Sequence, residues 1–347
     1  MLRLFPFVPY RTQPGTEANK ACFGDPSAPK LAENAILCIL KEDGRLLEFH
    51  FSDEAGCLHT FDYVRVRDVN EAIALLQAAP GEVRPLAGGT ELVPALQTGR
   101  LPVRCVVDIK GIAPLQELAY RPDEGLYLGA VVTFDRLLAQ PEVRRLYPLL
   151  VEAARQIASP AVRNRATVGG AVCVAAAYSD WLPALLCQDA VGLVMGAAER
   201  RIPLAEFVCG DGCTRLAADE LLVGLWLPSP SGAAVGSYQK LRLGHGSRIT
   251  LVGAAIQAHA HDGQLQDWRM ALTAVGPKPF RVSAAEALLN QENPTAAVIA
   301  EAVLRAQAAA APTDDFRAGA DYRRAMVGVL VRRGIETVLA RVRGAKP

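Results

Sequence analysis

Two glycine-bearing segments, residues 85–92 and 166–171, contain the residue types in this sequence that are best suited to chemistry. Each places adjacent glycines beside a threonine, at the edge of an apolar run. Adjacent glycines allow backbone N–H groups to turn toward an anion with no side chain in the way, and the hydroxyl adds a hydrogen-bond donor. Two such segments in one chain predict a diphosphate held by two backbone loops. A dinucleotide such as FAD could be bound in this way without a Rossmann fingerprint.

The first segment lies between a strand expected at 83–86 and a helix expected at 91–98. A turn that leads into a helix N-terminus favours phosphate binding, because the unpaired N–H groups and the helix dipole both attract an anion. Taken alone, Gly88-Gly89 is also compatible with an ordinary strand–helix turn. The second segment, in the same chain and in a fixed order, favours the phosphate-binding interpretation. A bulky residue at Gly89 or Gly169 is therefore expected to abolish FAD retention.

The cysteines give no sign of a metal centre. None forms C-x-x-C, and the closest pair, Cys209 and Cys213, has no second pair or histidine nearby in the sequence. Iron–sulfur and zinc sites usually need tight clusters of ligands, so we predict free, reduced thiols. Redox chemistry would then need an organic cofactor here, or a metal centre in another chain. The eight cysteines are Cys22, Cys38, Cys57, Cys105, Cys173, Cys187, Cys209 and Cys213.

Four other polar residues have a structural interpretation beside a functional one. Asp108 and Thr133 are expected to cap turns and satisfy backbone groups. His259 and His261 alternate along an expected strand and could share a metal. Because no third ligand lies near them, exposed strand positions are the preferred interpretation.

Composition bounds the function classes. The chain has 347 residues, which favours two domains over one. Lys plus Arg number 37 and Asp plus Glu 36, a net charge of +1 that gives no support to a nucleic-acid partner. The longest apolar stretch, 181–198, is interrupted by Gln188 and Asp189, whereas a membrane span needs about 20 mostly apolar residues. The N-terminus does not resemble a secretory signal, so a cytoplasmic location is expected.

The expected elements indicate an α+β architecture. A hairpin is expected at 35–51 around Asp43-Gly44, and a helix capped by Asp68 follows it. Further strands are expected at 104–109, 126–130, 190–195, 221–227 and 235–243, with helices at 134–139, 143–157 and 181–188. Two long apolar runs between 249 and 275 form a second hairpin, and the tail is helical at 283–290, 296–311 and 321–342. A domain boundary is expected near residue 230, where prolines and a glycine cluster.

Several ordered motifs give the chain a family resemblance over roughly residues 60–343. They are Ala87-Gly88-Gly89-Thr90-Glu91, Val107-Asp108-Ile109-Lys110-Gly111-Ile112, Leu128-Gly129-Ala130-Val131-Val132-Thr133, Val162-Arg163-Asn164-Arg165-Ala166-Thr167-Val168-Gly169-Gly170, Ser179-Asp180, Tyr238-Gln239-Lys240 and Asp321-Tyr322-Arg323-Arg324. With these the chain resembles the FAD-binding subunit of the molybdenum hydroxylases, a group that includes xanthine dehydrogenase, aerobic carbon monoxide dehydrogenase and 4-hydroxybenzoyl-CoA reductase.

The resemblance implies a fold and a division of the chain. Residues 59–230 would form a two-lobed FAD-binding domain of the vanillyl-alcohol-oxidase (PCMH) type. Residues 231–347 would form the C-terminal flavoprotein domain, a small three-stranded antiparallel sheet with helices. Residues 1–58 have no counterpart and form an extension of unknown role.

The resemblance also implies which residues contact a non-covalent FAD. Residues 85–92 would wrap the pyrophosphate from one side and residues 166–171 from the other. Asp180 would hydrogen-bond the ribityl or nearby oxygens, or alternatively cap the helix that begins near Trp181. Lys240 would approach the polar edge of the isoalloxazine, where a cation favours the anionic reduced flavin; a solvated lysine is the alternative. The full set is Pro85, Leu86, Ala87, Gly88, Gly89, Thr90, Glu91, Leu92, Ile157, Ala166, Thr167, Val168, Gly169, Gly170, Ala171, Asp180, Leu222 and Lys240, with Ile157 near the adenine or flavin edge and Leu222 near the ring.

Three departures from the family pattern affect these expectations. Ala171 stands where many relatives have Asn, and Ala175-Ala176-Ala177-Tyr178 stands where many have Ser-Pro before Ser-Asp. One side-chain contact to the cofactor would be lost, and Tyr178 could crowd or stack on it. Cys173 is followed directly by Ser179-Asp180, without the four-cysteine loop of the CoA-reductase relatives, so no [4Fe–4S] cluster is expected.

The resemblance implies an electron-transfer subunit of an oxidoreductase complex, such as a heterotrimer. A large partner chain would hold the molybdenum cofactor, and a small partner chain would pass electrons through [2Fe–2S] clusters to FAD. NAD⁺, oxygen or a quinone would be the external acceptor. No residue of this chain is assigned a catalytic or metal-binding role. The alternatives are a stand-alone flavin oxidase or reductase, and a scaffold subunit without cofactor.

Overall fold

The computed structural model describes residues 36–40, 46–52, 58–244, 249–261 and 264–344, with the backbone alone described up to residue 60. The chain divides into two compact units, Met1–Ile112 and Ala113–Pro347. This division differs from the predicted domain limits near residues 58 and 230, which follow the family's domains and stay a prediction. Residues 1–35 of the predicted extension lie outside the described residues.

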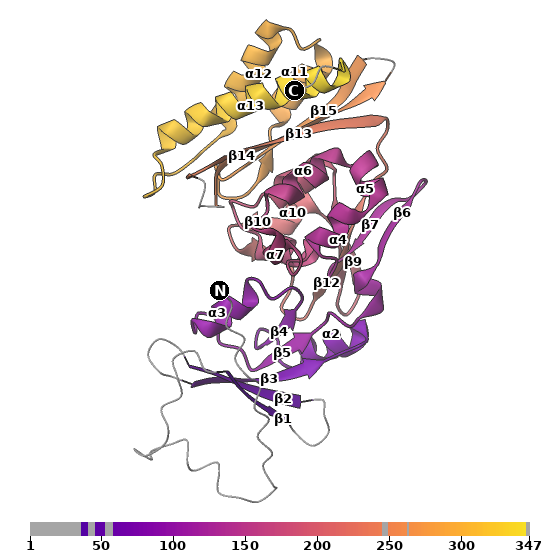
Figure 1. The fold of residues 1–347 in the computed structure, drawn as a ribbon, viewed down its shortest axis with the longest axis vertical. Helices are drawn as coiled ribbons and strands as arrows, with labels where there is room; N and C mark the ends of the chain where they lie inside the picture. Colours follow the sequence, from indigo (N-terminus) through magenta and orange to yellow (C-terminus); the bar gives the residue numbers. More distant parts are fainter. Residues whose placement is uncertain (1–35, 41–45, 53–57, 245–248, 262–263, 345–347) are drawn as a thin grey trace, which may run out of the picture. The chain divides into compact units, whose positions relative to one another are not determined.

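The first unit is built on a five-stranded sheet with the order β1-β2-β3-β5-β4 (Figure 1). The pairs β1–β2 and β2–β3 are antiparallel, and β5 is parallel to both β3 and β4. The predicted hairpin at 35–51 is confirmed as β1 and β2, although its turn lies outside the described residues. The extension of unknown role therefore contributes two strands to this sheet, β1 at its edge and β2 between β1 and β3. The strands are β1 (Ile36–Leu40), β2 (Leu46–Ser52), β3 (Leu58–Arg65), β4 (Val83–Leu86) and β5 (Cys105–Asp108).

Two helices accompany this sheet. Helix α2 (Val69–Ala78) begins as predicted, because the Asp68 carboxylate accepts hydrogen bonds from the N–H groups of Asn70 and Glu71. Helix α3 (Leu92–Gln97) follows the first glycine segment and is shorter than predicted. It contributes Leu96 to a small core with Phe61 and Val106.

The second unit contains an antiparallel sheet with the order β6-β7-β12-β8-β9 and a group of short helices. One apolar core joins sheet and helices, and in it Phe134 packs edge-to-face on Trp181 with ring centroids 5.1 Å apart. The strands are β6 (Leu118–Arg121), β7 (Gly125–Gly129), β8 (Val191–Met195), β9 (Glu199–Pro203) and β12 (Leu221–Leu227). The helices are α4 (Phe134–Ala139), α5 (Pro141–Leu146), α6 (Pro148–Gln156), α7 (Pro160–Arg163), α8 (Val168–Val174), α9 (Trp181–Cys187) and α10 (Leu204–Phe207), with a 3₁₀ turn η1 (Ala113–Gln116).

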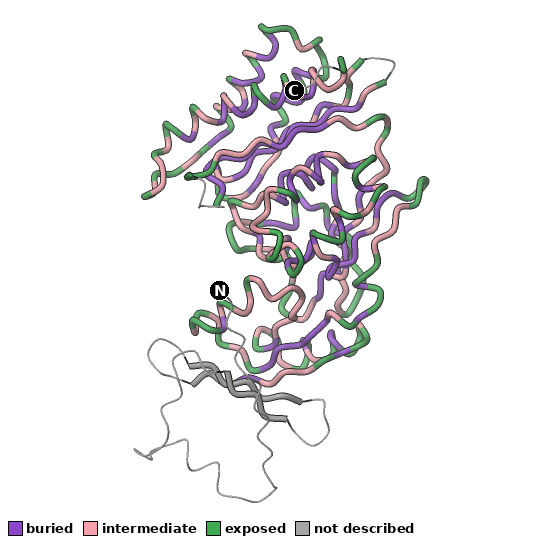
Figure 2. The backbone as a smooth tube through the Cα atoms, in the orientation of Figure 1, coloured by how far each residue is buried: buried purple, intermediate pink, exposed green. Residues whose placement is uncertain are grey.

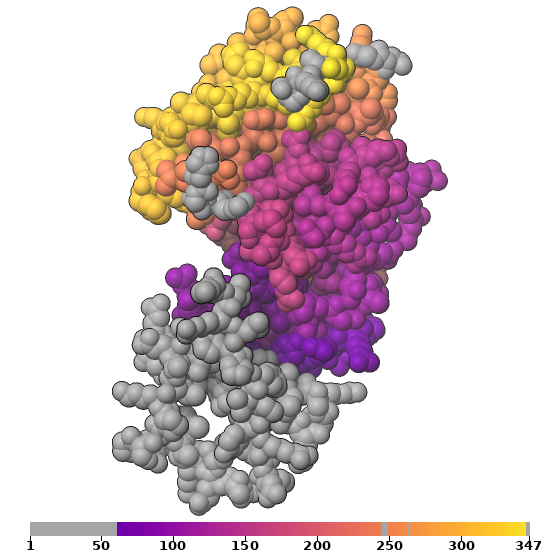
Figure 3. All heavy atoms as spheres, viewed as in Figure 1, coloured from indigo at the N-terminus to yellow at the C-terminus, as the bar shows by residue number. Residues whose placement is uncertain are grey.

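A second antiparallel sheet follows, with the order β13-β14-β15-β16. Helices α11, α12 and α13 lie on one side of it, while α6 lies on the other (Figure 1). The central strand β14 is almost entirely buried (Figure 2), and α13 shows its outer face on the molecular surface (Figure 3). The expected three strands are joined by a two-residue fourth. The elements are β13 (Ala233–Arg242), β14 (Thr250–His261), β15 (Gln264–Thr273), β16 (Phe280–Arg281), α11 (Ser283–Gln291), α12 (Ala296–Ala309) and α13 (Ala320–Val342).

Sequence patterns missed some short elements and joined two others. The helix expected at 143–157 is two helices, α5 and α6, because Pro148 has no N–H to continue the ladder and so begins a new helix. The edge strands β6 and β9 were not expected, because β6 is only four residues long and the residues of β9 are largely polar and exposed. A small hairpin, β10 (Val208–Gly210) with β11 (Cys213–Thr214), was also missed. No helix in the described ranges has the length and apolar character that a membrane crossing requires.

Candidate functional site

The first glycine segment forms a turn between β4 and α3, as predicted. Gly89 has φ +77°, a conformation that L-residues rarely adopt. The carbonyl of Gly89 accepts the first bond of the helix, from Val93 N–H at 3.0 Å. Glu91 stands at the N-cap but makes no side-chain capping bond.

The backbone N–H groups in this turn are open. Among the described residues, those of Gly88, Gly89 and Thr90 have no hydrogen-bond acceptor in the chain. Successive N–H groups in a turn with one residue at positive φ form a concave site for an anion. The turn is therefore suited to a phosphate oxygen.

Asp108, at the end of β5, has the structural role expected of it. Its carboxylate accepts a hydrogen bond from the backbone N–H of Lys110 at 3.0 Å. The same carboxylate forms an ion pair with the Lys110 ammonium at 2.8 Å. The Tyr63 hydroxyl also donates to it. Burial alone would raise the pKa of Asp108, but the bonds from Lys110 and Tyr63 outweigh burial and lower it.

The second glycine segment differs from its prediction. Gly169 and Gly170 do not lie in a loop but in the first turn of α8, with Thr167 as N-cap. Every backbone N–H from Val168 to Ala171 already donates within the chain, to Val132 O, Ala130 O, Thr167 Oγ1 and Thr167 O respectively. The hydroxyl proton of Thr167 is the donor of this turn for which the described residues provide no acceptor.

Close contacts within the chain explain why both positions of this turn are glycine. A Cβ on Gly169 would lie 2.7 Å from Ala130 Cα and 2.8 Å from its carbonyl oxygen. A Cβ on Gly170 would lie 2.7 Å from Thr167 Oγ1. The sequence predicted that a cofactor comes close to the backbone at Gly169. In the structure, the group that comes close is Ala130, in the segment after β7.

Asp180 and Lys240 form a buried ion pair. Lys240 Nζ lies 2.6 Å from Asp180 Oδ2, and the two side chains are 4% and 9% exposed. The interpretation of Lys240 as a solvated lysine is therefore wrong. The capping alternative for Asp180 is wrong as well, because Ser179 Oγ accepts the N–H groups of Trp181 and Leu182 at the start of α9.

Two hydroxyl groups complete the surroundings of this carboxylate. Tyr238 and Thr250 both donate to Asp180 Oδ1, at 2.8 and 2.7 Å. Burial raises the pKa of Asp180, and the ammonium and both hydroxyls oppose that rise. Burial, together with the charge of Asp180, places the pKa of Tyr238 well above its ordinary value. Because its pKa is raised, the Tyr238 hydroxyl keeps its proton at neutral pH and stays a hydrogen-bond donor.

The alternation of strand β13 explains why these groups meet. Tyr238 and Lys240 are two residues apart and so project from the same face. Lys240 also donates to the carbonyl of Gln156 at 3.3 Å, at the C-terminal end of α6, where the helix dipole favours a cation. Ile157, the C-cap of α6, directly follows Gln156, whose carbonyl binds Lys240.

The remaining predicted site residues of the second unit lie in or against its core. Leu222 is only 3% exposed and belongs to the same apolar cluster as Ala166 and Val168, and Ile157 and Ala171 pack on that cluster. Val223, beside Leu222 at an irregularity of β12, accepts the N–H of Ala130 at 3.0 Å. A chain of backbone bonds thus links β12 to α8 through Ala130. Tyr178 is half exposed.

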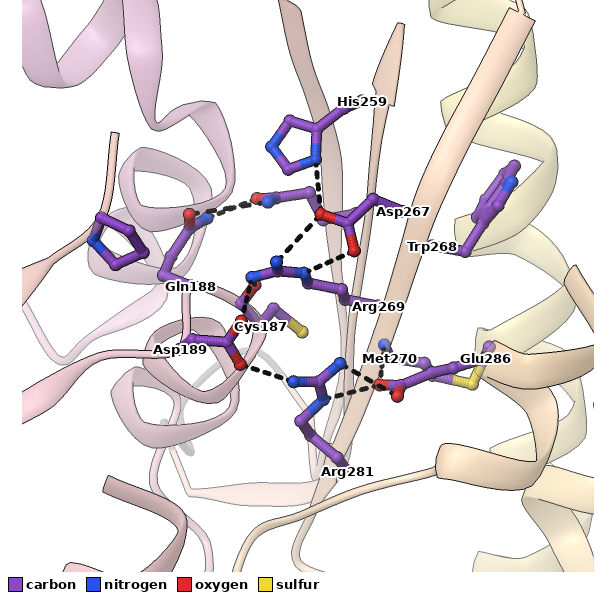
Figure 4. Close-up of polar contacts among 12 residues, drawn as sticks. Cys187, Gln188, Asp189, His259, Asp267, Trp268, Arg269, Met270, Arg281 and Glu286 are labelled. Carbon is purple, nitrogen blue, oxygen red and sulfur yellow. Dashed lines mark hydrogen bonds and ion pairs between the residues drawn. The ribbon is translucent and has the colours of Figure 1, made fainter. Parts of the chain in front are cut away.

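The far end of α9 is held by charged groups on the C-terminal sheet (Figure 4). Asp189 pairs with Arg269 at 2.7 Å and with Arg281 at 2.6 Å. Arg269 also donates to the carbonyl of Cys187 at 3.0 Å. These bonds fix the position of α9, which begins immediately after Asp180.

His259 and His261 lie in different surroundings. His259 is 3% exposed and bonds through Nδ1 to Asp267 Oδ2 at 3.0 Å, so the expected exposed position is wrong for this residue. His261 is exposed, as expected. Within the described ranges no group of His, Cys, Asp and Glu could hold a metal ion.

Sequence reasoning missed several residues of this site. Thr250 was not chosen, and Tyr238 and Ala130 were seen only as parts of motifs. The spacing of Tyr238 and Lys240 is a signal that could have found the first, since strand alternation places both on one face. The contacts of Thr250 and Ala130 arise from folding over long sequence separations, which no local pattern indicates.

Each of the two units, taken by itself, holds polar groups that suit one part of a flavin dinucleotide. The open N–H groups at 88–90 match a phosphate, and the ion pair with two hydroxyls matches the polar atoms of a ribityl chain or a flavin ring. Whether the predicted residues contact FAD stays a prediction.

Comparison with known proteins gives the family. Residues 59–230 match the FAD binding domain in molybdopterin dehydrogenase, and residues 237–338 match the CO dehydrogenase flavoprotein C-terminal domain. The chain is 30% identical to the carbon monoxide dehydrogenase medium chain of Hydrogenophaga pseudoflava over 284 residues, covering 81% of this chain and 98% of the relative. It is also 30% identical to the xanthine dehydrogenase FAD-binding subunit of Escherichia coli O157:H7, over 81% of this chain and 97% of the relative.

Solved structures agree with this assignment. The structure resembles a chain of carbon monoxide dehydrogenase from Hydrogenophaga pseudoflava with a TM-score of 0.77 and 31% identity, over 81% of this chain and 98% of that one. It resembles a chain of quinoline 2-oxidoreductase from Pseudomonas putida 86 with a TM-score of 0.75 and 26% identity, over 82% and 98% of the two chains. The chain belongs to the family of FAD-binding subunits of molybdenum hydroxylases, which are oxidoreductases.

Proposed function

We propose that this chain is the FAD-bearing electron-transfer subunit of a molybdenum hydroxylase complex. A large partner chain holds the molybdenum cofactor and oxidises the substrate, and a small partner chain holds [2Fe–2S] clusters. Electrons pass from those clusters to FAD in this chain and leave to NAD⁺, oxygen or a quinone. The observation that carries the proposal is the match of both family domains, in order, together with relatives named as medium chains.

The pyrophosphate of FAD binds at the first glycine segment. The N–H groups of Gly88, Gly89 and Thr90 are the open donors that support this assignment. At the second segment, the backbone N–H groups are already used, so Thr167 contributes its hydroxyl instead. This revises the sequence expectation of two equivalent backbone loops.

Lys240 and Asp180 form the polar contact with the flavin end of the cofactor. Bound FAD supplies the two-electron and one-electron redox chemistry of the complex. Because the Asp180 carboxylate lies 2.6 Å from Lys240 Nζ, it cancels much of the ammonium's field. The pair therefore acts as an oriented dipole, and its effect on a neighbouring negative charge is smaller than that of an unpaired lysine.

Composition of the purified protein tests the proposal. The chain expressed alone is expected to contain FAD that acid releases, and to lack iron and molybdenum. Coexpression with its genomic neighbours is expected to yield a complex that contains all three. After anaerobic photoreduction, reoxidation by NAD⁺, oxygen or a quinone, each added separately, identifies the acceptor. A flavin-loaded chain that needs no partner to oxidise an organic substrate would instead establish a stand-alone oxidase.

The role of the ion pair is tested by the midpoint potential of bound FAD. Lys240→Met is expected to lower that potential by on the order of 30 mV, a tenfold change in the two-electron equilibrium. Asp180→Asn is expected to raise it, because the ammonium is then no longer compensated. Arg242→Met removes an exposed cation from the same strand and is the matched control. Equal potentials in all three variants would mean that the pair lies away from the flavin.

A further inference from the structure

Two exposed cysteines face each other across the small hairpin β10–β11. Val208 pairs with Thr214 and Gly210 pairs with Cys213, so Cys209 is an extra residue that makes a β-bulge. The bulge places Cys209 opposite Cys213, and the two Sγ atoms are 2.6 Å apart. Both residues are exposed, unlike Cys105 and Cys187, which are buried.

The hairpin is held in place at both ends. At its base, Lys278 Nζ donates to the carbonyl of Val208 at 2.6 Å. At its tip, Asp211 Oδ1 accepts the N–H of Ala177 at 2.8 Å, and Gly212 N–H donates to the carbonyl of Ala175 at 3.1 Å. These anchors keep the strands together, so the two thiols are already aligned before any reaction.

Burial distinguishes this pair chemically from Cys105 and Cys187. Desolvation raises the pKa of Cys105 to about 11 and that of Cys187 further still. Those thiols stay protonated near neutral pH and are poor nucleophiles. Cys209 and Cys213 are accessible to a reagent from solvent, and each has the other within bonding reach.

We propose that Cys209 and Cys213 form a reversible disulfide, and that this hairpin is a redox-modification site for peroxides. One thiolate attacks a peroxide oxygen, the O–O bond breaks, and a sulfenic acid and hydroxide form. The second thiol then attacks the sulfenic sulfur, so that an S–S bond forms and water leaves. Two thiols are oxidised by two electrons while the peroxide is reduced to two water molecules. A dithiol reductant reverses the reaction by exchange.

The disulfide has a local effect on the segment beneath the hairpin. It closes the short loop around Asp211, which holds the Ala177 N–H. Opening of that hydrogen bond requires the hairpin tip to move, and the crosslink restricts this motion. The amide of Ala177 is therefore expected to exchange its hydrogen about tenfold more slowly in the oxidised protein. Because Ala175–Ala177 leads to Asp180, the modification acts next to the candidate site without touching it.

Peptide mapping of the full chain tests the proposal independently of FAD. Trypsin releases residues 202–215 as one peptide that contains only these two cysteines. After treatment with hydrogen peroxide, this peptide is expected to lose two hydrogen masses and to regain them with dithiothreitol. Cys105 and Cys187 are internal controls that remain reduced. Cys173→Ser is expected to leave the result unchanged.

Cys209→Ser and Cys213→Ser should each abolish the mass loss and the slower exchange of Ala177 while the protein stays folded, since both positions are exposed. Oxidation of the wild-type peptide to sulfinic or sulfonic acid without the loss of two hydrogens would overturn the proposal. An unreacted peptide under conditions that oxidise free glutathione would overturn it too.

Discussion

The two glycine segments resemble each other in sequence but differ in what their glycines do. At 85–92 the turn leaves the N–H groups of Gly88, Gly89 and Thr90 open, and Gly89 is required by its positive φ. At 166–171 every backbone N–H from Val168 to Ala171 is paired inside the chain, and Gly169 is required because Ala130 lies against it. The first segment is free to bind an anion, whereas the second starts a packed helix.

The difference teaches that a glycine pair in a sequence signals close backbone approach without saying to what. The approaching group can be a ligand or another part of the same chain. Substitutions should therefore separate binding from stability: changes in the first segment affect FAD, and changes at Gly169 affect the fold.

The largest effect is expected for Gly169→Val. Its Cβ would lie 2.7 Å from Ala130 Cα, where backbone must move. We expect a loss of more than about 3 kcal/mol in the free energy of unfolding, or insoluble protein. Urea unfolding followed by circular dichroism measures it. Ala171→Ser, two residues along the same helix, is the control and should unfold close to wild type. A stable, colourless Gly169→Val protein would show that this glycine serves the cofactor after all.

A smaller effect is expected for Asp108→Asn, and it depends on pH. The pKa of Asp108 is lowered on folding, so its contribution is fully present above the ordinary aspartate range and is lost as pH falls through the lowered value. Near neutral pH the variant should lose about 2 kcal/mol, the value of charge-assisted hydrogen bonds. Urea titrations at several pH values should show the difference narrowing in acid. A pH-independent difference would contradict this account.

The free energy of unfolding is expected to change with pH in opposite directions for the two buried acids, Asp108 and Asp180. The pKa of Asp180 is raised on folding, so the stability linked to its titration is lost as pH rises through the raised value. Asp108 contributes in the opposite direction. The same series of urea titrations therefore distinguishes the two units by the sign of the slope.

Gly89→Ala is expected to cost about 1 kcal/mol of stability, because alanine is strained at positive φ. The new Cβ would also press on Leu86 and Val93, at 3.1 and 3.3 Å. FAD affinity should fall by a larger factor, since the open N–H groups would be misaligned. Gly89→Asn is the matched control, because asparagine tolerates this conformation better. Fluorescence titration of FAD into each apoprotein gives the affinities, and equal affinity for alanine and glycine would contradict the anion-site interpretation.

The smallest effect is expected for Thr167→Ala. It removes the N-cap acceptor of the Gly170 N–H, with a cost of about 1 kcal/mol. Thr167→Ser keeps the hydroxyl and should restore most of the loss. If Thr167 also donates to FAD, alanine alone will weaken FAD binding. Thermal unfolding with and without FAD separates the two contributions, and identical shifts for Ala and Ser would exclude the hydroxyl from both roles.

Local patterns predicted most long elements but few of the contacts between them. The cap at Asp68, the hairpin of β14 and β15 and the three C-terminal helices follow from residue periodicity and turn chemistry. Edge strand β9 was missed because three of its residues are charged or polar and exposed. The Asp180–Lys240 pair joins residues far apart in the chain, and it was reached only through the family resemblance. Neither periodicity nor spacing could reveal that Ala130 accounts for Gly169.

The most direct test of the central claim is the amount of FAD that acid releases from the purified wild-type chain and from Gly89→Ala, beside their urea midpoints. Wild type is predicted to release about one molecule of FAD per protein chain. Gly89→Ala is predicted to lose most of it, while the Ala113–Pro347 unit of the FAD-free variant unfolds at the same midpoint as that of FAD-free wild type. A folded wild-type chain that stays colourless and cannot be reconstituted with FAD would contradict the account and indicate a scaffold subunit.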